Sequence, residues 1–139
     1  MTAIRVTHEA NSCYRVAVGR HLLTIDQPED AGGEDLGPTA VQLFAASLVA
    51  CTAHYAGSYL ARHGLSSEGL VVEGEYEMVD RPARLGSMSV TITPPVGLPE
   101  HRKAGLLAVA SHCTLHNTLR DPMNVEVAFA EADAPIPAT

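Results

Sequence analysis

Alternating apolar and polar positions open the chain and predict a three-stranded meander. Residues 3–9, 13–18 and 21–26 each show the alternation of a strand, and short turns at Asn11-Ser12 and Gly19-Arg20 separate them. A polar stretch rich in Gly and Pro, QPEDAGGEDLGP, follows. We therefore expect an N-terminal β meander followed by a surface loop.

The longest apolar stretch predicts one long helix. Pro38 stands at its first turn, where a missing N–H costs nothing, the helical pattern runs through residues 39–63, and Gly64 ends it. Apolar residues cover most of the circumference, with polar ones interspersed singly. This pattern is typical of a helix that is buried on several sides.

The remaining pattern predicts a hairpin, more helix and a last strand. Their expected ranges are 70–80 and 84–93 for the hairpin strands, 100–113 for an amphipathic helix, 115–120 for a short helical turn and 124–130 for the strand. The tail, 131–139, is expected to be disordered. The order βββ–α–ββ–α–β predicts a single α+β domain over residues 1–139.

Composition and charge exclude several classes of protein. The net charge of −7 leaves no basic patch, so we expect no nucleic-acid partner. The first ten residues lack the features of a signal peptide, and 41–56 is too polar to span a membrane, so we expect a cytoplasmic protein without membrane contact. Aromatic residues make up only 4% of the chain and Trp is absent, so a homodimer interface could supply stability that the core lacks.

Two similar tetrapeptides carry the candidate chemistry: Cys51-Thr52-Ala53-His54 and Cys113-Thr114-Leu115-His116. If the two helices that carry them meet, the chain has either a redox pair or a metal site. Ser47, His54 and Tyr55 lie one helical turn from Cys51, and such a polar cluster favours the reactive thiolate.

Cys113 is expected at the C-terminal end of the helix 100–113, flanked by His112 and His116. The helix dipole disfavours a thiolate at that end. A cysteine that waits as a thiol suits a resolving role better than that of the primary nucleophile.

The metal alternative is a Cys2His2 zinc site made by Cys51, His54, Cys113 and His116. Structural zinc sites usually place their ligand pairs on knuckles and short loops, whereas the first pair here lies in the middle of an apolar helix. We therefore expect neither a metal nor another cofactor.

At these residues the chain resembles a known family. GPTAVQLFAASLVAC resembles the start of the central helix of the OsmC/Ohr proteins, the osmotically inducible and organic hydroperoxide resistance family, in which the peroxidatic cysteine lies. SHCTLHNTL resembles the second signature of the family, which holds the resolving cysteine. The order of elements also matches, to about residue 130. The resemblance implies an OsmC-like fold: meander, long central helix with Cys51, hairpin, second helix with Cys113, and final strand, in an intertwined homodimer.

The resemblance also implies a thiol-dependent peroxidase for oxidative-stress defence. Cys51 would attack an organic hydroperoxide and become a sulfenic acid, which Cys113 would convert to a disulfide. A dithiol reductant would reset the pair by exchange, and in the Ohr branch this is a lipoylated protein. His54 and His116 would assist the two cysteines without contacting the substrate themselves.

The chain departs from the family pattern at two places. Where the family has a Glu that holds an N-terminal Arg beside the thiolate, this chain has Val41 and Gln42, so Gln42 would hold the Arg, with Arg15 and Arg20 as candidates. Thr114 replaces the Pro of the second signature. The missing carboxylate favours an alternative, a non-catalytic dimer of this fold that binds small molecules or lipids.

Overall fold

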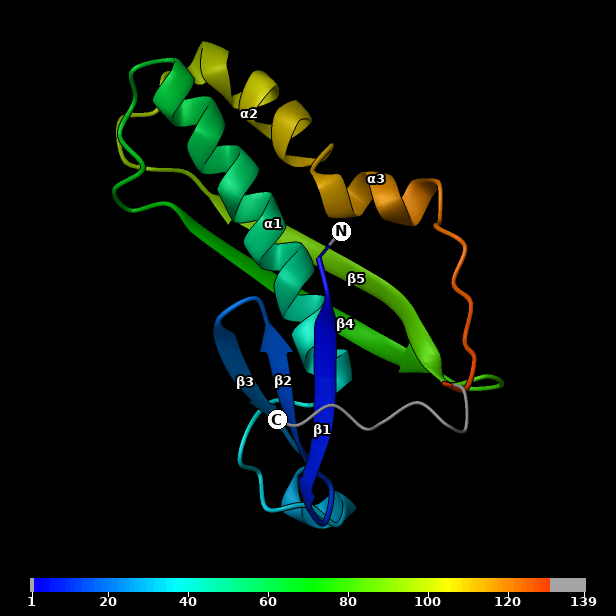
Figure 1. Ribbon diagram of the computed structural model, residues 1–139. Coiled ribbons are helices and arrows are strands. Elements are labelled where there is room, and N and C mark those ends of the chain that lie inside the picture. Colours follow the sequence, from blue (N-terminus) through cyan, green and yellow to red (C-terminus); the bar gives the residue numbers. More distant parts are fainter. Residues whose placement is uncertain (1, 131–139) are drawn as a thin grey trace.

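The computed structural model describes residues 2–130 and divides into a helical layer on a hairpin and a meander beside it (Figure 1). Helix α1 (Ala40–Arg62) lies across β4 (Val71–Val79) and β5 (Arg84–Thr93). Helix α2 (Lys103–Ala110) packs against α1. The meander lies at the end where α1 begins.

The meander forms as expected. Its strands are β1 (Ile4–Ala10), β2 (Cys13–Val18) and β3 (His21–Ile25), antiparallel in the order β1-β2-β3. Cys13 and Val16 on the central strand are buried, yet much of the remaining apolar surface is exposed: Ile4 is 65% and Leu22 64% accessible. This small sheet therefore leaves apolar side chains uncovered.

A buried carboxylate organises the loop between the meander and α1. Asp26 accepts hydrogen bonds from the Ser12 hydroxyl and from the backbone N–H groups of Gln27, Glu34 and Leu36. Its own N–H donates to the carbonyl of Pro38 at 3.2 Å. The hydrogen bond from Ser12 lowers the pKa of Asp26 most, and the three N–H groups lower it further against the opposing effect of burial.

Helix α1 begins and ends where its sequence predicts. Thr39 is the N-cap and forms a reciprocal capping box with Gln42, at 3.0 Å in both directions. Gly64 follows the helix with a φ of 66°, a left-handed conformation that glycine adopts without strain.

The core lies between α1 and α2. It consists of Ala56, Tyr59, Leu60, Leu106 and Ala110. The small side chains of Ala56 and Ala110 are fully buried and let the helices approach closely. At Gly105 a Cβ atom would lie 2.5 Å from the Tyr59 hydroxyl, so only glycine fits there without rearrangement.

The hairpin is confirmed, and its inward face is the one that the alternation indicates. Val72 and Tyr76 are half-buried, while the glutamates between them are exposed.

By length and composition alone α1 would suffice to cross a membrane, a test that core helices of soluble proteins also pass.

Two expectations for the C-terminal third are wrong. The helix expected over 100–113 is a short 3-10 turn, Glu100–Arg102, followed by α2, which ends at Ala110. The Ser111 hydroxyl and the His112 Nδ1 donate to the carbonyls of Leu107 and Ala108, so these side chains occupy carbonyls of the last turn. A separate helix, α3 (Thr114–Arg120), follows.

The strand expected over 124–130 does not form. Every residue of this segment is exposed, and none pairs with a neighbouring strand in the part of the chain that the structure describes. Its alternation is that of a strand, but a strand needs a partner ladder, and neither sheet of the described residues pairs with it.

Candidate active site

Cys51 lies in the middle of α1 and is half-buried. The polar cluster expected around it does not form. The Ser47 hydroxyl donates to the carbonyl of Phe44 at 2.6 Å, and His54 is exposed with its ring edge-on to Tyr55. Among residues 2–130, neither His54 nor Ser47 makes a hydrogen bond to the Cys51 thiol.

Cys113 is not at the end of a helix but before the start of one. It is the N-cap of α3 in an extended conformation, with φ −65° and ψ 162°, and it is fully buried. The unfavourable dipole predicted from a C-terminal position therefore does not apply. The Cys113 Sγ accepts the backbone N–H of His116 at 3.4 Å, and the His116 Nδ1 lies 2.8 Å from the same Sγ.

The two thiols are neighbours, and both are free. Burial raises the pKa of the Cys113 thiol most, and the N–H of His116 opposes this by stabilising the thiolate. The neighbouring Cys51 thiol raises the pKa of Cys113 further. The helices that carry the two tetrapeptides thus bring Cys51 and Cys113 together.

A hydroxyl pair joins the two cysteine-bearing segments. The Tyr55 hydroxyl, one turn after Cys51, lies 2.6 Å from the Thr114 hydroxyl, next to Cys113. It is the one side-chain hydrogen bond between α1 and α3 in the described part of the chain. This pair was not expected from the sequence, although Thr114, which replaces the Pro of the second signature, was a signal that could have indicated it.

In the second tetrapeptide the His116 ring contacts the Cys113 sulfur, whereas in the first the His54 ring makes no hydrogen bond with Cys51. Burial lowers the pKa of His116 most, and the positive charges of Arg120 and His112 lower it further. Over residues 2–130 no three His, Cys, Asp or Glu side chains gather in an arrangement that could hold a metal ion. His54, one of the four ligands of the Cys2His2 alternative, is exposed with its ring edge-on to Tyr55 and joins no such group.

Comparison with known proteins identifies the family. The family model described as OsmC-like protein matches residues 32–128, which is more than half of the chain. The chain belongs to the OsmC-like protein family. No curated protein sequence matches it.

Solved structures share the OsmC-like fold. A protein of Psychrobacter arcticus 273-4, provisionally described as an osmotic stress induced and detoxification response protein, has a TM-score of 0.78 and 20% identity over 85% of this chain and 88% of its own. The organic hydroperoxide resistance protein OsmC of Legionella pneumophila has a TM-score of 0.67 and 24% identity over 86% and 89%. OhrB of Bacillus subtilis, an organic hydroperoxide resistance protein, has a TM-score of 0.61 and 19% identity over 86% and 92%. At these identities the likeness establishes the fold.

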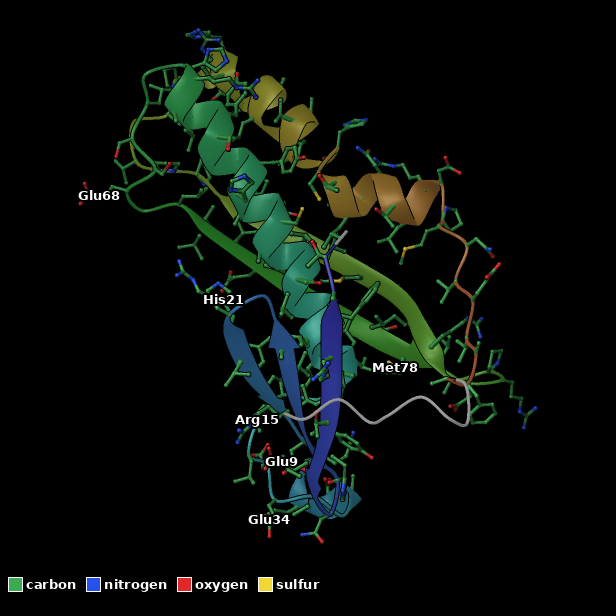
Figure 2. The ribbon with its side chains drawn as sticks, viewed as in Figure 1. Glu9, Arg15, His21, Glu34, Glu68 and Met78 are labelled. Atoms are coloured by element: carbon green, nitrogen blue, oxygen red, sulfur yellow. The ribbon has the colours of Figure 1, made fainter. Side chains whose placement is uncertain are left out.

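The arrangement that the resemblance implies, an arginine held by Gln42 beside Cys51, does not form among residues 2–130. The Gln42 side chain is engaged in the capping box of α1. Arg15 pairs with Glu9 at 3.0 Å on the meander (Figure 2). Arg20 is exposed in the turn between β2 and β3 and makes no ion pair or hydrogen bond with residues 2–130.

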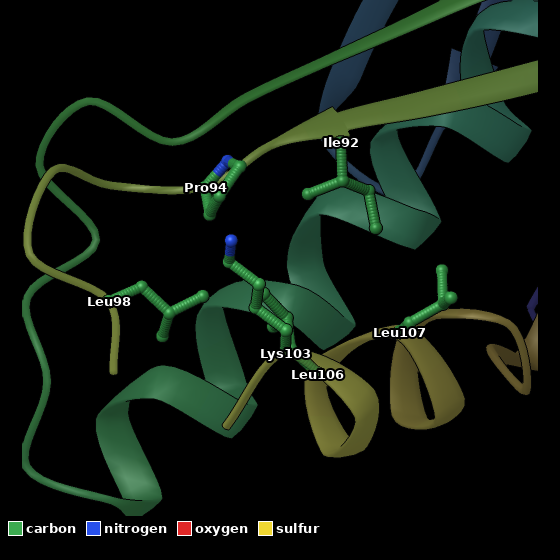
Figure 3. Close-up of a pocket in the computed structure, with 6 residues that line it drawn as sticks. All are labelled: Ile92, Pro94, Leu98, Lys103, Leu106 and Leu107. Carbon is green, nitrogen blue, oxygen red and sulfur yellow. The ribbon is translucent and has the colours of Figure 1, made fainter. Parts of the chain in front are cut away.

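Two largely apolar cavities lie along α2 and β5 in this OsmC-like protein, and neither is lined by a cysteine. One of about 370 Å³ contains His116 and Thr52 among otherwise largely apolar side chains of α1, β5, α2 and α3. Ile92 and Leu107 also line an adjoining cavity of about 260 Å³, which Figure 3 shows. The remaining lining of this adjoining cavity consists of Pro94, Leu98, Lys103 and Leu106, and it contains no cysteine.

Proposed function

We propose that the protein reduces organic hydroperoxides through a Cys51 sulfenic acid and a Cys51–Cys113 disulfide. The observation that carries this proposal is that two free thiols are neighbours, one half-buried on α1 and one buried before α3, close enough for Cys51 to raise the pKa of Cys113. The names of the similar structures from Legionella pneumophila and Bacillus subtilis, both organic hydroperoxide resistance proteins, support it.

In the first step the Cys51 thiolate attacks the terminal oxygen of the hydroperoxide. An S–O bond forms, the O–O bond breaks, and the alkoxide takes a proton to leave as an alcohol. In the second step the Cys113 sulfur displaces hydroxide from the Cys51 sulfenic acid, which yields the disulfide and water. A dithiol, such as a lipoylated protein, then reduces the disulfide by exchange.

The cavity lined by His116, whose ring contacts Cys113, and the adjoining apolar cavity support an organic rather than an inorganic substrate. Their linings offer methyl and methylene groups to an alkyl or aryl substituent, whereas hydrogen peroxide gains nothing from them. Burial of such a substituent would lower the KM for cumene hydroperoxide below that for hydrogen peroxide.

We further propose that the site is completed in a homodimer. The meander exposes Ile4, Val6 and Leu22, and the segment 124–130 exposes Val127 and Phe129 almost completely. A second copy would cover these side chains and would bring an arginine of its own meander, Arg15 or Arg20, toward Cys51. Light scattering across a concentration series tests the assembly.

Mass spectrometry of the reduced protein tests the chemistry. One equivalent of cumene hydroperoxide should remove two hydrogen atoms from the mass within seconds, and peptide mapping should place the link between Cys51 and Cys113. Cys51→Ser should abolish this change. Unreacted wild-type thiols, or oxidation that does not depend on Cys51, would instead favour a binding dimer that uses the apolar cavities without turnover.

A further inference from the structure

His116 is placed where a proton acceptor for Cys113 would have to be. Its Nδ1 lies 2.8 Å from Cys113 Sγ, and its backbone N–H donates to the same sulfur. The contact follows from the local fold, because the extended N-cap directs the Cys113 side chain over the first turn of α3, where the third residue after it is His116. A general base must lie about 2.6–3.2 Å from the atom whose proton it removes.

The protonation states of the pair suit this role. Burial chiefly lowers the pKa of His116, so its imidazole is neutral at neutral pH, and burial chiefly raises the pKa of Cys113, so its sulfur carries the proton. A neutral imidazole beside a protonated thiol is able to accept the proton of that thiol.

The other groups around His116 are few. The titratable or charged groups are Cys51 on α1, Cys113 just before α3, Arg120 on α3 and His112 after α2. The side chains that β5 and α2 contribute to its cavity are neutral and apolar: Met88, Val90, Ile92, Leu107 and Ala110. No carboxylate of the described residues lines the cavity, so none competes with His116 for the thiol proton.

We propose that His116 is the general base of the disulfide-forming step. This proposal rests on the function proposed above and assigns a residue to its second half. As Cys113 Sγ attacks Cys51 Sγ, the thiol proton passes to His116 Nδ1. The S–S bond forms, the S–O bond of the sulfenic acid breaks, and the departing hydroxide takes the proton from the imidazolium and becomes water. The Cys51 sulfur is reduced, the Cys113 sulfur is oxidised, and His116 returns to its neutral form.

The matched test compares the two tetrapeptides. His116→Gln removes the base, and His54→Gln changes the equivalent position of the first tetrapeptide, whose ring is exposed. Rapid quenching with a thiol-alkylating reagent, followed by mass spectrometry, separates loss of the Cys51 thiol from formation of the disulfide. In His116→Gln the second step should slow by about 10²–10⁴-fold, far more than the loss of the Cys51 thiol in the first step. In His54→Gln the second step should be unchanged.

The pH profile distinguishes a base from a structural contact. In wild type the rate of the second step should level off above a pKa that lies below 6.5. In His116→Gln it should keep rising tenfold per pH unit until the Cys113 thiol ionises. His116→Ala should recover part of the rate in added imidazole. A second step that His116→Gln leaves unchanged, or one slowed equally at every pH without imidazole rescue, would overturn the proposal.

A parallel assay with glutathione disulfide separates this proposal from the peroxidase function. Cys51 attacks the reagent and releases one glutathione, and Cys113 then attacks the mixed disulfide and releases the second. Only the second release should carry the pH dependence that His116 imposes. If wild type ignores cumene hydroperoxide but shows this dependence here, the peroxidase proposal fails and the base assignment stands. If glutathione release is insensitive to His116, the base assignment fails whatever the peroxide result.

Discussion

The two Cys-x-x-His tetrapeptides have the same spacing but different surroundings. The first lies wholly inside α1, with Cys51 half-buried and His54 exposed beside the Tyr55 ring. The second spans the start of α3, with Cys113 fully buried and His116 folded back onto its sulfur. The same residue types thus give one thiol without an imidazole partner and one with it.

The difference shows that backbone conformation, rather than residue spacing, decides whether such a pair interacts. An extended residue before a helix directs its side chain toward the first-turn N–H groups, and the side chain three positions later can turn back to meet it. Within a continuous helix the backbone N–H groups are already bonded, and His54 takes a position at the surface instead. This local geometry supports the different roles proposed for the two cysteines.

The largest effect should come from Cys51→Ser. If the half-buried thiol is the nucleophile, peroxide consumption should fall by at least about 10³-fold, as expected when a covalent nucleophile is removed. Consumption of cumene hydroperoxide under a dithiol reductant measures this. A variant that kept a tenth of the wild-type rate would mean that Cys51 is not the reacting thiol.

Cys113→Ser should preserve the first step and stop the second. Without the buried partner, the Cys51 sulfenic acid should persist, gain one oxygen atom in mass, and proceed to sulfinic acid in excess peroxide. A sulfenic-acid-trapping reagent and intact mass spectrometry measure both species. Formation of a sulfenic acid on Cys113 in the Cys51→Ser protein would reverse the assigned roles.

Removal of the link between the two segments should have a moderate effect. Tyr55→Phe and Thr114→Val each delete one hydroxyl of the 2.6 Å pair. The equilibrium constant for closing the Cys51–Cys113 disulfide against glutathione should fall by about twofold to tenfold, the effect of one hydrogen bond. The double variant should be no worse than either single variant. Additive losses would show that the two hydroxyls act separately.

Thr114→Pro is a further test of the hydroxyl pair, beside Tyr55→Phe and Thr114→Val. Thr114 is the first residue of α3, a position that proline suits, so the family residue should preserve the helix while it removes the hydroxyl. Its disulfide equilibrium should match that of Thr114→Val.

The smallest effect concerns stability in mild acid. The pKa of His116 is lowered by burial in the folded state, so the unfolded chain binds its proton first as the pH falls below about 6.5. Wild type should therefore lose stability between this pH and the folded-state pKa of His116. In urea unfolding across this range, His116→Gln should lose less. An identical acid dependence would mean that His116 titrates alike in both states.

Local pattern was sufficient for most of the fold but not for the second cysteine. Strand alternation, Pro38 and Gly64 predicted the meander, α1 and the hairpin, because their signals lie within each element. The end of α2 depends on the hydrogen bonds that Ser111 and His112 make to carbonyls, which apolar periodicity does not encode. The alternation of 124–130 could show that the segment suits a strand, but not that it has a partner.

The candidate site was predicted in its residues and not in its contacts. Cys51, Cys113 and His116 were chosen by type and spacing, and the structure places Cys113 beside Cys51 and beside His116. Gln42 was predicted to hold an arginine, but its amide caps α1. Competition between such local and distant partners is decided by three-dimensional packing.

The loop fastened by Asp26 has a consequence for protein engineering. Its two ends are held by Asp26, which binds Ser12 on one side and the N–H groups of Glu34 and Leu36 on the other. The tip, Glu29–Ala31, contains no buried residue. Because closing a longer loop between fixed ends adds little entropic cost, a short epitope inserted between Asp30 and Ala31 should be displayed at the surface while the cysteine pair keeps its place.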